Sequence, residues 1–178
     1  KWDELRDDLR KDLNDPDGGF AFVFLLDDFV GSGTTLLRRK PEAGKWTGKL
    51  FRFWEDVEAI AASHFEPDWS LCIHHYLATH AARDTVQERN AEILKERGEA
   101  HWFKNVQFSF GATLPPDLPI TPAAHADFLA LTEKYYDKDI ETRHTRVASK
   151  DVKLGFGQCA LPLLLEPNHP NHAAALRA

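Results

Sequence analysis

FAFVFLLDDFVGSGTTLLRR, residues 20–39, is the most specific stretch of this sequence. It starts with an unbroken apolar run, Phe20 to Leu26, which is typical of a strand buried on both faces of a parallel sheet. Two adjacent carboxylates, Asp27 and Asp28, follow this run, and a loop rich in glycine and hydroxyl side chains, Gly31 to Thr35, comes next. The stretch therefore predicts a strand that ends in an acidic pair and a loop.

The composition of this loop is that of an anion site. In an open α/β sheet, ligands bind beyond the carboxyl ends of the strands, which is where Asp27 and Asp28 fall. Ionised carboxylates only accept hydrogen bonds, so the pair suits the 2′ and 3′ hydroxyls of a ribose, or a hydrated Mg2+. Glycine allows backbone N–H groups to turn toward an anion, and neighbouring hydroxyls add donors. The predicted phosphate-binding residues are Gly31, Ser32, Gly33, Thr34 and Thr35.

We expect a helix directly after the loop, because Leu36, Leu37 and Arg38 favour helices. Its positive end would face the same anion. The basic run 38–40 would close this helix near the site, although solvated charges are common at helix ends. A ribose on the carboxylates and a phosphate on the loop describe a ribose 5-phosphate site. The loop is not a Walker A motif, since no Lys follows its second glycine.

The acidic pair and the Gly/Thr loop resemble the phosphoribosyl pyrophosphate motif of type I phosphoribosyltransferases. Lys45–Trp54 (KWTGKLFRFW) and Leu154–Leu164 (LGFGQCALPLL), which runs into Pro167–Asn171, resemble a divergent phosphoribosyltransferase-like family of bacterial conflict and defence systems. The resemblance implies that Asp27 and Asp28 act as catalytic residues by holding the ribose hydroxyls. It also implies a phosphate on the loop, Mg2+ arriving with the pyrophosphate, and a transferase of nucleotide metabolism or a defence effector.

Two other interpretations stay open. The same loop resembles the cofactor loop of amino-DNA methyltransferases, which bind S-adenosylmethionine, but their Asn/Asp-Pro-Pro-aromatic tetrapeptide is missing: Leu114–Asp117 reads LPPD. The acidic pair favours the phosphoribosyl interpretation. A non-catalytic module that binds or senses a nucleotide is the third hypothesis, because a complete phosphoribosyltransferase has further strands and a pyrophosphate loop upstream. A Gly/Ser/Thr turn can also join a strand to a helix without binding a ligand.

Composition sets limits on these hypotheses. The chain has 178 residues, which predicts a single domain over residues 1–178. It has no Met, so we expect Lys1 to be an internal position of a longer protein, with a truncated N-terminus. A net charge of −6 argues against general binding to nucleic acid or membrane surfaces, whereas protein partners fit the composition. Cys72 and Cys159 form no spaced cluster, which favours a reducing cytoplasm.

Periodicity predicts the remaining elements of a mainly parallel, Rossmann-like sheet of about four to five strands flanked by helices. Trp2, Leu5, Leu9 and Leu13 recur at helical spacing. The helices expected further along cover residues 50–64, a segment capped by Asp84 or Thr85 and ended by Gly98, and a segment starting at Thr121-Pro122; the strands are 69–78, 102–110 and 159–165. The resemblance places the strand 69–78 beside the strand 20–26.

Histidines and a polar loop supply secondary candidates. Alternation along strand 69–78 sends His74 and His75 to opposite faces, so this pair does not make a metal site on its own, and no metal ligands are predicted. His80 lies at the end of the same strand, where it is a candidate for the second half of a ligand. The polar segment 137–151 carries bases that could close over an anion: Arg143, His144 and Arg146.

Overall fold

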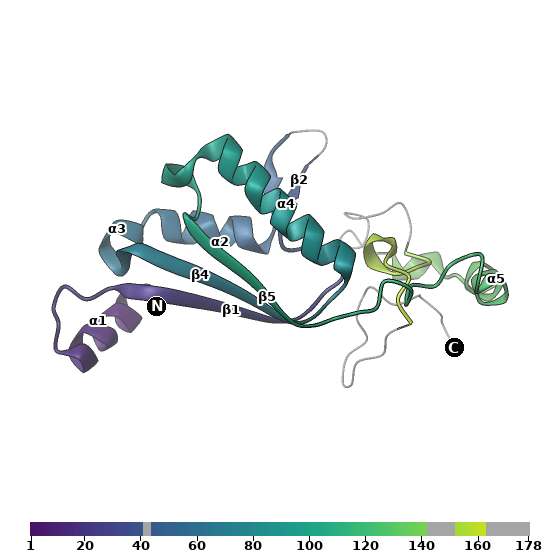
Figure 1. Cartoon of the computed structure of the whole chain (residues 1–178), viewed down its shortest axis with the longest axis horizontal. Coiled ribbons are helices and arrows are strands. Elements are labelled where there is room, and N and C mark those ends of the chain that lie inside the picture. The colour runs from purple at the N-terminus through teal and green to yellow at the C-terminus, as the bar shows by residue number, and fades with distance from the viewer. Residues whose placement is uncertain (41–43, 142–151, 163–178) are drawn as a thin grey trace.

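The computed structural model describes residues 1–40, 44–141 and 152–162, which have an α/β fold (Figure 1). A three-stranded parallel sheet in the order β1-β4-β5 forms its centre. Its strands are β1 (Phe20–Val30), β4 (Phe65–Ala78) and β5 (Asn105–Thr113), and β2 (Arg38–Arg39) pairs with β3 (Trp46–Thr47) in a separate antiparallel hairpin. The predicted parallel α/β class is confirmed, with fewer strands in the described sheet than predicted.

The two longer crossover helices cover the same face of the sheet (Figure 1). The strand order advances in one direction from β1 through β4 to β5, and right-handed crossovers in one direction leave their helices on one side. The described helices are α1 (Trp2–Leu13), α2 (Lys49–Glu58), α3 (Ala61–His64), α4 (His80–Arg97) and α5 (Ala126–Lys134), with 3-10 turns η1 (Glu99–His101), η2 (Lys138–Ile140) and η4 (Phe156–Gln158).

The hydrophobic core lies between this covered face and the helices α2 and α4. In this core, Leu71 and Ile73 of β4 are fully buried, as are Val57 of α2 and Val86 of α4. Each such side chain contributes about 1.5–3 kcal/mol relative to exposure. An aromatic cluster extends the core at the amino ends of the strands: Trp2, Phe20, Phe53, Trp54, Phe65, Trp69, Trp102 and Phe103.

The opposite face of the sheet is bare among the described residues. On β1, Phe22, Phe24 and Leu26 are 62%, 65% and 64% exposed, and Tyr76 on β4 is 61% exposed. The prediction that this apolar run is buried on both faces is therefore wrong for the chain as described. The run is apolar on both sides, yet both crossover helices lie over one side only.

The helix expected after the loop is also absent. Arg38 and Arg39 form β2, and Arg38 pairs with Thr47. Leu36 and Leu37 are buried in the core as a turn. The first N–H groups of α2 donate to this turn instead, Lys49 N to Thr35 O at 3.0 Å and Leu50 N to Leu36 O at 3.0 Å. Tertiary packing therefore overrides the helix propensity of this short segment.

Several element boundaries differ from the sequence prediction. α4 begins at His80 with Thr79 as its cap, rather than at Asp84 or Thr85, while its end at Gly98 is confirmed. α5 begins at Ala126, after the predicted start at Thr121. The helix at residues 2–13 and the strand within 65–78 are confirmed, including its predicted place beside β1. Of the predicted last strand, Leu161 forms an isolated bridge, and residues from 163 onward lie outside the described residues.

Two glycines in glycine-only conformations provide a test of this packing. Gly48 has φ +127° and Gly98 has φ +74°, and both have extended ψ values. A Cβ on Gly48 would overlap the Leu36 carbonyl group, whereas a Cβ on Gly98 would meet no atom within 4 Å. We expect Gly98→Ala to lower the free energy of unfolding by about 1–3 kcal/mol and Gly48→Ala to lower it by more than about 3 kcal/mol. Denaturant titration of both variants measures this difference, and equal losses would contradict the close contact at Gly48.

Candidate functional site

The candidate site lies at the carboxyl ends of β1 and β4, where Thr79 joins the two strands. Its backbone N–H donates to Val30 O at 3.1 Å, and its hydroxyl donates to Gly31 O at 2.6 Å. The same hydroxyl oxygen accepts the N–H of Ala82 at 2.9 Å and so caps α4. One side chain thus fixes the start of the glycine loop against the first turn of α4.

The loop itself is held by close packing and by its own hydroxyls. Gly33 has φ +71°, and a Cβ there would lie 2.9 Å from the Val86 side chain of α4. This is the positive φ for which glycine was expected, whereas Gly31 does not have one. The hydroxyls of Ser32 and Thr34 lie 2.7 Å apart in a hydrogen bond. Thr35 O, as described above, holds the start of α2.

Three backbone donors of this loop have no acceptor in the described part of the chain, whereas the Thr34 N–H donates to Ser32 Oγ at 3.4 Å. The N–H groups of Ser32, Gly33 and Thr35 form no hydrogen bond there, although Gly33 is buried. Backbone N–H groups away from bulk water nearly always have a partner. Successive free N–H groups in a turn are the donor arrangement that binds anions. The loop thus has spare donors for water or for an anionic ligand.

Three guanidinium groups surround the end of the same loop. Arg38 Nη1 donates to Thr34 O at 3.0 Å, and Arg89 Nη1, from α4, donates to Leu37 O at 2.7 Å. Burial lowers the pKa of Arg38, and the positive charge of Arg52 on α2 lowers it further. Burial also lowers the pKa of Arg89; Glu92 opposes this effect and the charge of Arg38 adds to it. These groups are close enough to repel one another, so a bound anion would be stabilised here.

Asp27 meets a lysine and a histidine on the covered face. Its Oδ2 accepts a hydrogen bond from Lys49 Nζ, at the start of α2, at 2.7 Å. Burial alone would raise the pKa of Asp27, but the hydrogen bond and charge of Lys49 and the proximity of His75 outweigh it, so this pKa lies below its usual value. Asp27 is therefore ionised at neutral pH and can accept hydroxyl donors.

His75 is paired with Asp27 in the parallel register of β4 and β1 and is 1% exposed. Its ring stacks on Phe110 of β5, with centroids 6.1 Å apart. Its Nδ1 has no hydrogen-bond partner in the described part of the molecule. Burial lowers the pKa of His75; Asp27 opposes this effect, whereas Lys49 and His74 add to it. The imidazole is therefore neutral at pH 7.

Asp28 lies on the other face of the sheet, since alternate residues of a strand point to opposite sides. It is exposed, and its Oδ1 accepts the backbone N–H of Phe29 at 2.8 Å. The structure thus brings Asp27, but not Asp28, together with Lys49 and His75. The shared role of the two carboxylates in holding one ribose stays a prediction from the motif.

The remaining candidates divide between the edge of the site and segments that are not described. His80 opens α4 beside Thr79 and is half-buried. Gly157 packs on the loop, since a Cβ there would lie 2.9 Å from Ser32 Cβ, so the turn η4 closes one side of the loop. Burial raises the pKa of the Cys159 thiol to about 11, which leaves it protonated and unreactive. Arg143, His144, Arg146 and the segment 167–171 lie outside the described residues.

Sequence reasoning did not single out several residues of this site. Lys49 and Arg52 reach it from α2, within the stretch Lys45–Trp54 that carries the resemblance, but no role was predicted for them; Arg89 reaches it from α4 and lies in no quoted motif. For His75 the signal was present, because its parity along the strand puts it on one face with Ile73 and Leu77. Within residues 1–40, 44–141 and 152–162, no group of three or more His, Cys, Asp or Glu side chains could hold a metal ion.

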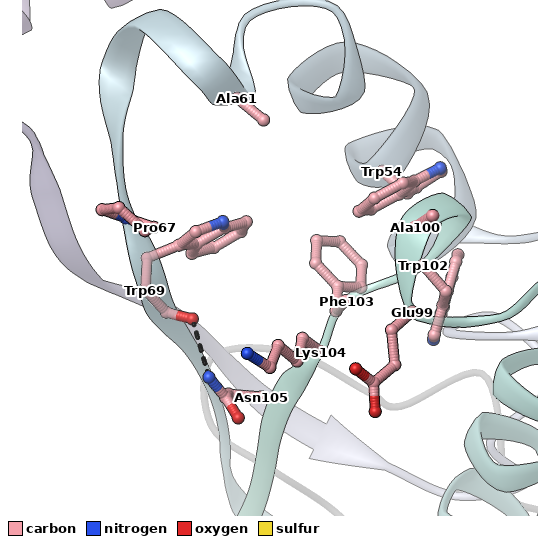
Figure 2. Close-up of a pocket in the computed structure, with 10 residues that line it drawn as sticks. All are labelled: Trp54, Ala61, Pro67, Trp69, Glu99, Ala100, Trp102, Phe103, Lys104 and Asn105. Atoms are coloured by element: carbon pink, nitrogen blue, oxygen red, sulfur yellow. Dashed lines mark hydrogen bonds between the residues drawn. The ribbon is translucent and has the colours of Figure 1, made fainter.

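A pocket lies at the opposite, amino-terminal end of the sheet (Figure 2). This pocket of about 210 Å³ is walled by aromatic rings of the core, with Trp54, Trp69 and Phe103 around the open space. Of its two charged side chains, Lys104 is already bound to Asp68 at 2.7 Å. Because its walls are mainly aromatic and its lysine is already paired, the pocket does not match an anionic ligand, so we place the candidate site at the carboxyl edge.

Comparisons with family models, curated proteins and solved structures gave no match to this chain. Among the helices described, none combines the length and the apolar character that crossing a membrane requires. The functional argument therefore depends on the motif and on the geometry around it.

The buried imidazole predicts a pH dependence of stability. The unfolded chain protonates His75 near pH 6.5, and the folded chain does so only at lower pH. Its contribution is therefore complete above pH 6.5 and is lost as the pH falls below that value, by up to about 1.4 kcal/mol per pH unit. Urea titrations of the wild type and of His75→Phe between neutral and mildly acidic pH measure this slope.

The His75→Phe variant keeps a ring beside Phe110 and removes the titrating group, so its unfolding free energy should fall less steeply with decreasing pH. Titration of Asp27 does not interfere with this comparison. Because the pKa of Asp27 is lowered from 3.8, the stability that its ionised form contributes is lost only at more acidic pH. An unchanged slope in His75→Phe would contradict the lowered pKa of this histidine.

Proposed function

We propose that this chain binds a phosphorylated ribose, namely phosphoribosyl pyrophosphate or a related nucleotide, at the carboxyl ends of β1 and β4. The observation that carries the proposal is the set of free N–H groups at Ser32, Gly33 and Thr35 beside the guanidinium group of Arg38. Backbone donors without an acceptor, next to a positive charge, are the complement of a phosphate group.

The loop and the carboxylate divide the ligand between them. The 5′-phosphate accepts from the loop N–H groups and from the hydroxyls of Thr34 and Thr35. The ribose hydroxyls donate to Asp27, whose side chain remains one-third exposed despite its bond to Lys49. Mg2+ requires one or two protein carboxylates when it is already held by phosphates, so Asp27 is sufficient for a metal that arrives with pyrophosphate. The bound metal would neutralise the charge of the pyrophosphate.

Phosphoribosyl transfer breaks the bond between the anomeric carbon and pyrophosphate and forms a bond to an acceptor. Positive charge develops on the ribose ring, and an ionised Asp27 stabilises it. The cation Lys49, beside Asp27, stabilises the departing negative charge, while Arg38 stays with the 5′-phosphate on the loop. A sensing module would use the same contacts and leave the ligand intact, so release of pyrophosphate distinguishes the two activities.

Calorimetric titration with phosphoribosyl pyrophosphate and Mg2+ tests the ribose site. The wild type should bind, and Asp27→Asn should lose at least about tenfold in affinity, because one charged acceptor is removed. Asp28→Asn is the matched control, since its side chain lies on the other face and should change affinity by less than about threefold. A larger loss in Asp28→Asn would contradict the assignment to Asp27. Binding of S-adenosylmethionine in its place would overturn the proposal in favour of a methyltransferase.

A second pair of variants tests the phosphate contact. Arg38 donates to the loop, whereas its neighbour Arg39 donates to Gly44 O at 2.9 Å and lies 3.4 Å from Glu96. We expect Arg38→Gln to weaken binding of the phosphorylated ligand about tenfold and Arg39→Gln to change it by less than about twofold. Titration with ribose 5-phosphate in parallel measures the phosphate contribution alone. Equal effects of the two substitutions would show that only net charge matters.

A further inference from the structure

Two guanidinium groups meet where the loop, the hairpin and α2 join. Arg38 Nη1 donates to Thr34 O at 3.0 Å. The side chain of Arg52 turns back toward the start of α2, and its Nε lies 3.5 Å from Gly48 O. Gly48 itself packs directly on the Leu36 carbonyl group. Both guanidinium groups therefore lie beside the end of the loop.

Neither guanidinium group has a carboxylate partner in the described part of the chain. Their neighbour Arg39, by contrast, lies 3.4 Å from Glu96. Carboxylates are not scarce, because the whole chain has 28 acidic and 22 basic residues. Burial lowers the pKa of Arg38 and the positive charge of Arg52 lowers it further, so the two groups repel each other. An anion beside them would relieve this repulsion.

A single phosphate on the loop would leave Arg52 without an anionic partner. That phosphate accepts from the loop N–H groups, from the hydroxyls of Thr34 and Thr35, and from Arg38, which already give it several donors and one cation. Arg52 is exposed, and its guanidinium group has more N–H donors than its one contact with Gly48 uses. Arg52 is therefore open to a second anionic group.

Lys49 connects Arg52 to the ribose end of the site. The two residues are three apart on α2, so their side chains are neighbours on the helix surface. Lys49 Nζ lies 2.7 Å from Asp27, the carboxylate assigned to the ribose. Arg52 is therefore next to the cation at the ribose and next to Arg38 at the phosphate loop. On a phosphorylated ribose, further negative charge at this place comes from another phosphate group, because the sugar and a nucleobase are neutral.

We propose that Arg52 binds a further phosphate group of the ligand and is the residue by which the site selects ligands that carry one. The inference rests on the proposed function and narrows its ligand to a phosphorylated ribose with more than one phosphate. Two kinds of ligand have this chemistry. Phosphoribosyl pyrophosphate carries the additional phosphates on the anomeric carbon, whereas a nucleoside diphosphate carries its second phosphate at the 5′ end.

Two pairs of ligands test this assignment by calorimetric titration of the full chain with Mg2+ present. Ribose 5-phosphate and phosphoribosyl pyrophosphate differ only in the pyrophosphate, and AMP and ADP differ only in the second 5′-phosphate. In one pair or both, the wild type should bind the ligand with more phosphates about tenfold more tightly or better. Arg52→Gln should reduce that ratio below about threefold and change the affinity for ribose 5-phosphate and AMP by less than about twofold. The pair whose ratio falls identifies where the further phosphate is attached.

Arg39→Gln is the matched control, because it removes the same charge from a guanidinium group that already has Glu96 as its partner, and it should keep the wild-type ratio. Circular dichroism of each variant establishes that it is folded. An unchanged ratio in Arg52→Gln, or an equal loss for both ligands of a pair, would overturn the inference and leave the proposed function intact. A wild type that binds ribose 5-phosphate and AMP but gains nothing from a further phosphate would do the same. Absence of binding to all four ligands would instead overturn the proposed function, and the inference with it.

Discussion

The direction of the two crossovers is the constraint on which the rest of this structure depends. Each connection leaves a strand, passes through a helix and returns to a parallel strand on the same side of the previous one. Right-handed crossovers in one direction put α2 and α4 on one face of the sheet. The odd positions of β1 therefore face the helices, and the even positions face away from them. Asp27 faces Lys49 and the core, whereas Asp28 and the exposed side chains of Phe22, Phe24 and Leu26 lie on the other side.

The parts of the fold that the sequence predicted well are those set by local periodicity. The alternation along residues 69–78 correctly separates His75 from His74, and the apolar stripe at residues 2–13 correctly gives a helix. Burial of both faces of β1 could not be predicted correctly, because an unbroken apolar run has the same appearance whether its second face is covered within the chain or left bare. The prediction of a helix at Leu36–Arg38 was wrong for a related reason: two adjacent leucines are equally compatible with a turn buried in the core.

The candidate site was predictable only where it is continuous in sequence. The glycine loop follows from local chemistry, and of the two glycines expected to use their backbone freedom, Gly33 has a positive φ and Gly31 does not. The cations arrive from elsewhere: Lys49 from the start of α2 and Arg89 from the middle of α4. Their proximity to the motif in space depends on the lengths of the connections and of the hairpin, and no local sequence pattern predicts it.

The two hydrogen bonds of the Thr79 hydroxyl link the loop to the first turn of α4. Its hydroxyl is the helix cap and also a tether for Gly31, so fraying of the first helical turn releases the loop at the same time. Amide hydrogens around Ala82 and those of residues 31–35 therefore belong to one unit of local opening. We therefore expect a ligand that holds the loop to slow hydrogen exchange in the first turn of α4 without touching it.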